Sequence, residues 1–123
     1  IDTVADVQRW LNSAYNSALA VDGIYGAKTK AALVKVLQRA VGVSVDGIYG
    51  AKTNAAVKSL RRGSAGTAVK ALQGLLVCNG FTDAYVDGDF GKGTEQAVIA
   101  YQRSNGLDDE GIAGRNTFGK LCK

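Results

Sequence analysis

Apolar residues recur along this chain at helical spacing, in six separate stretches. Within each stretch they fall three or four positions apart, which places them on one face of a helix. Glycine-containing polar segments separate the stretches and are typical of turns. The spacing predicts helices over residues 3–15, 27–41, 51–61, 66–79, 92–104 and 115–122. The pattern therefore predicts an all-α fold.

A nine-residue motif is repeated between the predicted helices. It occurs as VDGIYGAKT twice, then as VDGDFGKGT and in a degenerate form as DEGIAGRNT, at residues 21–29, 45–53, 86–94 and 109–117. The acidic residues of the first and third copies are 65 positions apart, and those of the second and fourth are 64 apart. Two tandem three-helix modules with internal loop–helix repeats are therefore predicted, over residues 1–62 and 63–123.

The motif has the chemistry of a turn that leads into a helix. Asp-Gly favours a turn, because the carboxylate accepts nearby N–H groups and glycine tolerates positive φ. Gly26 is expected to cap the next helix, and Thr29 to bond back to the start of that helix. Val21 and Ile24 are expected to plug the loop into the core. Four glutamines interrupt the apolar stripes at matching places, and we expect them to tie helix to loop rather than to line a groove: Gln8, Gln38, Gln73 and Gln102.

The start of each motif helix is a candidate ligand site. Free N–H groups, the helix dipole and a first-turn lysine favour an anion, and the aromatic residue of the motif suits a sugar ring or a peptide methyl. The aspartates are expected to shape the loops. The predicted ligand-binding residues are Asp22, Tyr25, Lys28, Asp46, Tyr49, Lys52, Asp87, Phe90 and Lys92. The alternatives are that the aromatic residues cover the core edge and that the lysines are ordinary solvated charges.

Composition argues against several functions. The chain has no His and no evident nucleophile with a base, so we expect no catalysis, cofactor or metal site. The net charge of +4 is small, because 11 acidic residues offset most of the 15 basic ones. Nucleic acid is therefore not an expected partner. No stretch has the apolar length of a membrane span, so membrane insertion is not expected. Because the chain has no Met, we expect it to be a processed or excised part of a longer protein.

The two cysteines fall at the ends of the fourth and sixth predicted helices. Cys78 and Cys122 could meet if these helices are antiparallel, and an extracytoplasmic location would permit a disulfide within the second module. The alternative is a pair of unpaired, partly buried thiols. The sequence leaves both alternatives open.

Residues between the motifs complete a longer pattern in the second half. This pattern comprises Leu72-Gln73, residues 86–91, Thr94, Ala97-Val98, Tyr101-Gln102, Gly106-Leu107, Gly111-Ile112, Gly114 and Thr117. The first half matches it at Val7-Gln8, both VDGIYGAKT loops, Leu37-Gln38 and Gly42-Val43. Over almost the whole chain, the pattern resembles the peptidoglycan-binding domain 1 family. Asp109, Glu110 and Ala113 depart from that family's pattern, which implies that any ligand site in the fourth loop is degraded.

The resemblance implies non-catalytic three-helix modules that hold bacterial or phage wall hydrolases, such as endolysins and autolysins, on peptidoglycan. We accordingly expect binding to the glycan strand or stem peptide at the bacterial cell wall, outside the cytoplasm, by a secreted or phage-delivered protein. A covalently linked catalytic domain is expected elsewhere in the parent chain. The alternative function is a calcium-dependent protein–protein interaction module, since paired Asp-Gly loops superficially resemble duplicated calcium loops. Ile24 and Gly26 argue against it, because they supply no side-chain oxygen at the alternate positions.

Overall fold

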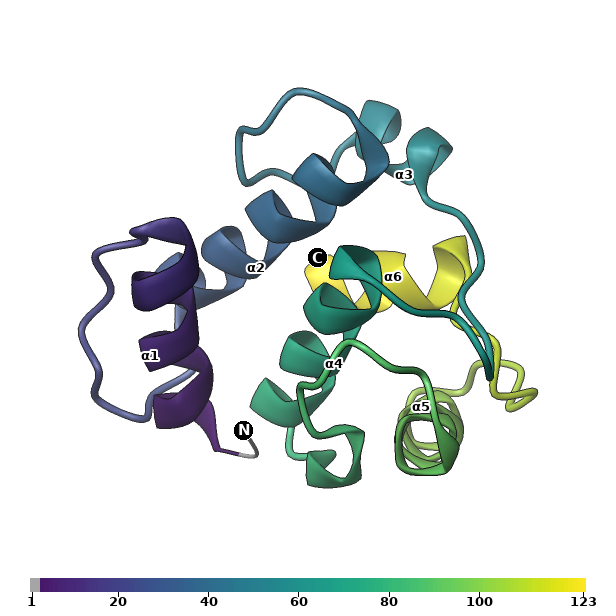
Figure 1. The fold of residues 1–123 in the computed structure, drawn as a ribbon. Coiled ribbons are helices and arrows are strands. Elements are labelled where there is room, and N and C mark those ends of the chain that lie inside the picture. The colour runs from purple at the N-terminus through teal and green to yellow at the C-terminus, as the bar shows by residue number, and fades with distance from the viewer. Residues whose placement is uncertain (1–2) are drawn as a thin grey trace.

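The computed structural model describes residues 3–123, which form six α-helices and one short 3-10 helix (Figure 1). They are α1 (Val4–Tyr15), α2 (Ala27–Val41), α3 (Ala51–Ala56), α4 (Thr67–Cys78), η1 (Thr82–Ala84), α5 (Lys92–Ser104) and α6 (Arg115–Cys122). The all-α prediction is confirmed, and every predicted helix except the third agrees to within one residue at each end. Among residues 3–123, no helix combines the length and apolar character needed to cross a membrane.

The third helix is shorter than its predicted range of 51–61. It ends at Ala56, and Val57 is extended, with φ −64° and ψ 130°. Leu60 then pairs with Ala113 through two backbone hydrogen bonds of 2.9 and 2.8 Å. Val57 is buried in the core and Leu60 packs against it, so an extended segment, rather than a helix, satisfies their apolar spacing.

Helix α4 lies at the centre of the molecule. It is contacted by α1 and α2 from the first half, and by η1, α5 and α6 from the second (Figure 1). The approach between α2 and α4 is close, because a Cβ atom added at Gly74 would lie 2.7 Å from the Cδ2 atom of Leu33. One continuous cluster of buried apolar side chains includes Leu11, Leu37 and Phe118. The two halves therefore share a single hydrophobic core.

The segment that joins the two halves is bound to the second half. The Gly63 N–H group donates to the Phe90 carbonyl at 3.0 Å, and the Phe90 N–H group donates to the Ser64 carbonyl at 2.9 Å. With the Leu60–Ala113 pair, these bonds hold the joining segment against the third and fourth motif loops. The joint is therefore a fixed part of the fold.

Both cysteines are free, buried thiols in the structure. Of the two alternatives that the sequence left open, the structure has the unpaired thiols and not the disulfide. Burial raises the pKa of Cys78 and of Cys122 to about 12. Both thiols are therefore protonated at neutral pH and unreactive as nucleophiles.

Candidate functional site

A buried glutamine ties each motif loop to the helix before it. Gln38 on α2 is 1% exposed, and its Nε2 atom donates to Asp46 Oδ1 at 2.8 Å, to the Ile48 carbonyl at 3.0 Å and to Thr53 Oγ1 at 3.1 Å. Its Oε1 atom accepts from the N–H groups of Asp46 and Gly47 at 3.1 and 2.9 Å. One side chain thus binds the loop and the first turn of the helix after it. This confirms the prediction that the glutamines tie helix to loop.

The same arrangement recurs in the first and third loops. Gln8 and Gln73 make the corresponding five bonds at 2.9–3.2 Å. The hydroxyl of Thr29 is buried against Gln8, so the prediction that Thr29 bonds back to the start of its own helix is wrong. Gly26 is the N-cap of α2, as predicted.

The motif aspartates act as turn formers. The Oδ1 atoms of Asp22, Asp46 and Asp87 each accept the backbone N–H group two residues later, at 2.9–3.0 Å, and also accept from the loop's glutamine. The backbone bond, and then the glutamine bond, holds the pKa of Asp22 and of Asp46 below its ordinary value. Within residues 3–123, no three His, Cys, Asp or Glu side chains are grouped as metal ligands.

The aromatic residues of the motif point into the protein. Phe90 is 2% exposed and Tyr49 is 6% exposed, so neither presents a ring face to a ligand, contrary to prediction. The alternative that they cover the core edge holds for both. Tyr49 donates its hydroxyl to Asn54 Oδ1 at 2.9 Å, and burial raises its pKa to about 12. Tyr25 is half-buried, packs against the core, and has its pKa raised mainly by burial.

The aliphatic residues of the first two loops face solvent instead. Ile24 and Ile48 are 68% and 69% exposed, and Val21 is 43% exposed. The prediction that Val21 and Ile24 plug the loop into the core is therefore wrong. The neighbouring tyrosine takes the inward place, since its ring buries a larger area. The loops consequently present apolar side chains at the surface.

Two clefts with matching linings open beside the first and fourth motif loops. The first cleft has a volume of about 240 Å³ and is lined by Gln8, Leu19, Ala20, Asp22, Ile24, Gly26, Ala27, Lys28 and Thr29. The fourth-loop cleft has a volume of about 450 Å³ and contains the equivalent nine residues, Gln102, Leu107, Asp108, Glu110, Ile112, Gly114, Arg115, Asn116 and Thr117. After the glutamine, each pair of equivalent residues is 88 positions apart. The motif thus builds the same cleft twice.

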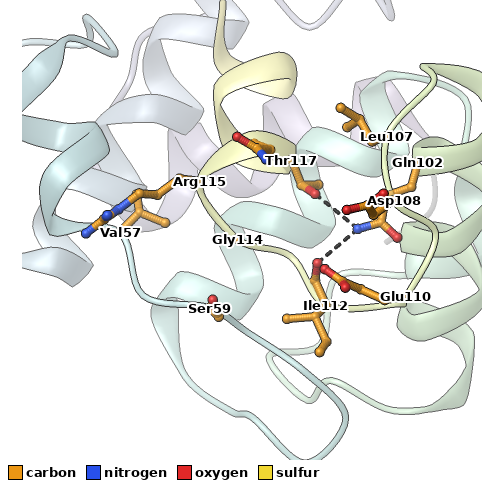
Figure 2. Close-up of a pocket in the computed structure, with 11 residues that line it drawn as sticks. Val57, Ser59, Gln102, Leu107, Asp108, Glu110, Ile112, Gly114, Arg115 and Thr117 are labelled. Carbon is orange, nitrogen blue, oxygen red and sulfur yellow. Dashed lines mark hydrogen bonds between the residues drawn. The ribbon is translucent and has the colours of Figure 1, made fainter.

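The joint between the two halves adds a further wall to the fourth-loop cleft. Val57 and Ser59 line this cleft from the joining segment, opposite the fourth loop (Figure 2). The start of α6 lies between them and the loop, at Gly114 and Arg115. Residues from both halves of the chain therefore form this site.

The fourth loop keeps only part of the glutamine network. Gln102 donates to the Ile112 carbonyl at 2.9 Å and to Thr117 Oγ1 at 3.1 Å, and accepts from the Gly111 N–H group at 3.1 Å (Figure 2). Within residues 3–123, the side chain of Gln102 makes no hydrogen bond to the carboxylate of Glu110. Replacement of aspartate by glutamate thus removes the carboxylate bond, while the cleft beside the loop remains.

All three predicted lysines are exposed. Lys52 is the second residue of α3, Lys92 is the first residue of α5, and Lys28 lines the first cleft. Sequence reasoning missed Leu19, which also lines this cleft. A signal was available, because Leu19 and Leu107 each precede the acidic residue of their motif by three positions.

The nine equivalent residues of each cleft fall within matches to a single protein family. A family model described as "Putative peptidoglycan binding domain" matches residues 2–57 and 65–121. The chain belongs to this peptidoglycan-binding domain family. Each match contains three α-helices separated by two motif loops, so the tandem organisation of this family is present in the chain.

A solved structure is similar to part of the chain. It is the crystal structure of a peptidoglycan-binding protein from Clostridioides difficile in complex with glutamine hydroxamate. The match has 38% sequence identity and a TM-score of 0.50, and covers 52% of this chain. It spans 40% of the length of that protein, so the similarity concerns a part of each molecule.

Proposed function

We propose that this chain binds peptidoglycan through the two equivalent clefts and anchors an attached cell-wall hydrolase, an endolysin or autolysin, to its substrate outside the cytoplasm. Membership of the peptidoglycan-binding domain family and the similarity to a peptidoglycan-binding protein support peptidoglycan as the ligand. The observation that carries the proposal is the recurrence of one nine-residue cleft lining at two places in the chain.

The groups in the first cleft suit a sugar that carries amide and carboxyl substituents. The first turn of α2 lines the cleft, and its N-cap, Gly26, has no side chain to cover the backbone N–H groups. These groups donate to carbonyl or carboxylate oxygens. Ile24 supplies an exposed apolar contact for a sugar face or a methyl group. The carboxylate of Asp22 is an acceptor for a hydroxyl group.

The two clefts are fixed on one body, because the halves share a core and the joint is hydrogen-bonded. When one cleft holds a polymer, the other meets the same polymer at a high effective concentration. Such linkage raises overall affinity by about 10²- to 10⁴-fold if both sites can engage together. Long residence on an insoluble polymer is what an anchoring region requires.

Co-sedimentation with purified sacculi tests this proposal. Ala20→Trp and Asp108→Trp place a large ring in the first and fourth-loop clefts at exposed positions. We expect the unaltered chain to pellet with sacculi, each variant to lose part of its retention, and the double variant to lose at least about tenfold. The matched control is Ala100→Trp, at an exposed position of α5 outside both linings. Retention of the double variant at the level of the control would contradict the proposal.

A further inference from the structure

A separate cleft lies beside the first-motif cleft. Its volume is about 380 Å³, and it lies between the segment after α1 and a face of α2. Leu19 and Lys28 line both clefts, so the two share a wall. We call it the cationic cleft, lined by Tyr15, Asn16, Ser17, Ala18, Leu19, Lys28, Ala31, Ala32, Lys35 and Arg39.

Every charged side chain in this lining is a cation. Lys28, Lys35 and Arg39 are exposed and lie seven and four positions apart on α2, which places them along one side of the helix. The guanidinium carbon of Arg39 lies 5.1 Å from the centre of the Tyr15 ring, an arrangement that holds the charge at the cleft. Three like charges in a concave surface concentrate anions there.

The wall opposite α2 is preformed. The Asn12 side chain donates to the Leu19 carbonyl at 2.9 Å and accepts from the Leu19 N–H group at 2.7 Å. Asn16 and Ala18 both adopt the left-handed conformation, with φ 53°. These features fix the path of the segment after α1, so a ligand need not order this wall when it binds.

In the second half of the chain, the segment between α4 and α5 forms η1, which packs onto both of these helices. Gly93 occupies the position before the motif threonine that Lys28 occupies in the first half, and a Cβ atom at Gly93 would lie 2.6 Å from the Asp83 carbonyl oxygen. Counted from the same threonine, Lys35 corresponds to Ala100. The first half also has the larger charge excess: residues 1–60 carry seven basic and four acidic side chains, against eight and seven in residues 61–123.

We propose that the cationic cleft binds an anionic group of the cell-wall polymer, a carboxylate or a phosphate, next to the part of the polymer held in the first-motif cleft. The peptidoglycan setting rests on the function proposed above, whereas the affinity for anions rests on the cleft itself. Arg39 offers a planar fork of N–H donors that matches either group, and the lysines add point charges. Lys28 stands on the shared wall, so one ligand can extend across both clefts.

An NMR titration of the ¹⁵N-labelled chain at low salt tests the anion site directly. The probes are sodium glycerophosphate and N-acetyl-D-glutamate. We expect amide shifts at Ser17, Leu19 and Lys35, and their loss in Lys35→Gln/Arg39→Gln. The matched control is Lys58→Gln/Arg61→Gln, which removes two exposed cations outside the lining and should keep the shifts. Shifts that persist in the first variant, or that spread evenly over all exposed cations, would overturn the inference.

Sacculi then identify the source of the anion. Lys35→Gln/Arg39→Gln is compared with its control on native sacculi and on sacculi stripped of phosphate-containing polymers with hydrofluoric acid. At low salt, we expect the Lys35→Gln/Arg39→Gln variant to be retained about fivefold more weakly than its control. At high salt, this difference should disappear. Weakening on native sacculi alone assigns a phosphate, and weakening on both assigns a stem-peptide carboxylate. Equal retention of variant and control on both would exclude a role for this cleft at the wall. Failure of the unaltered chain to pellet would contradict peptidoglycan binding, while the titration would still decide the anion site.

Discussion

At the scale of single residues, each motif loop depends on a buried glutamine. Gln38 makes five hydrogen bonds inside the protein, whereas its counterpart Gln102 makes three. A leucine in place of the glutamine would have a similar size. It would leave the N–H groups of the loop and the threonine hydroxyl without this hydrogen-bond partner. A buried polar group left unpaired is costly, so the glutamine matters more than its small share of the sequence suggests.

The first prediction compares these two glutamines. Gln38→Leu should lower the free energy of unfolding by about 2–4 kcal/mol, because several buried groups lose their partner at once. Gln102→Leu should cost about 1–2 kcal/mol, because its network is smaller. Urea denaturation followed by circular dichroism measures both. A cost for Gln38→Leu below that for Gln102→Leu would contradict this account of the loops.

The second prediction concerns acid. The pKa of Asp22 and of Asp46 is lower in the folded protein than the ordinary value, so each contributes stability that is present above the unfolded-state pKa. This contribution is lost as the pH falls through the folded-state pKa. As the pH is lowered past about 4, the melting temperature of the unaltered chain should therefore decrease. Asp22→Asn/Asp46→Asn should reduce this dependence, because it removes the two carboxyl groups with a lowered pKa.

The sequence predicted the role of the glutamines but not the direction of the residues beside them. Gln8 and its counterparts were recognisable because a polar residue recurred at one place in each apolar stripe. Ile24 and Tyr25 are both apolar neighbours, and no local rule decides which one turns inward. The outcome depends on residues far along the chain, because Tyr25 packs against the hydrophobic core that both halves share.

At the scale of elements, the spacing of apolar residues located the helices because each helix buries one face. It failed at the end of α3, where Val57 and Leu60 keep a helical spacing in an extended segment. The partner that extends this segment is Ala113, far along the chain, and local sequence contains no sign of that pairing. The same long-range pairing places Ser59 in the fourth-loop cleft, which explains why that wall was not predicted.

The third prediction tests the close approach of α2 and α4. Gly74→Ala should lower the free energy of unfolding by about 1 kcal/mol, because the new methyl group forces Leu33 to move in a packed core. Gly119→Ala, in α6, should instead raise it by about 0.5–1 kcal/mol, because its Cβ atom would make only ordinary contact, 3.9 Å from Tyr49. Denaturant unfolding of both variants provides the measurement. Equal stabilisation by the two alanines would show that the helices do not meet at Gly74.

At the scale of the whole molecule, the repeat shifts of 65 and 64 residues predicted two related halves. They did not predict that helices from both halves would enclose α4. The spacing of apolar residues along a helix is the same whether the helix packs within its own module or against a core that two modules share. The shared core fixes the spacing of the two clefts. The molecule is therefore a rigid body with two related sites, not two modules on a flexible linker.

The central claim is that the first and fourth-loop clefts bind peptidoglycan. An NMR titration of the ¹⁵N-labelled chain with a soluble disaccharide–peptide fragment of peptidoglycan tests it most directly. The account predicts that amide signals of residues 26–29 and 114–117 shift, and that the Ala20→Trp and Asp108→Trp substitutions each remove one of the two sets. Shifts that avoid both segments, or a spectrum unchanged at saturating fragment, would contradict it.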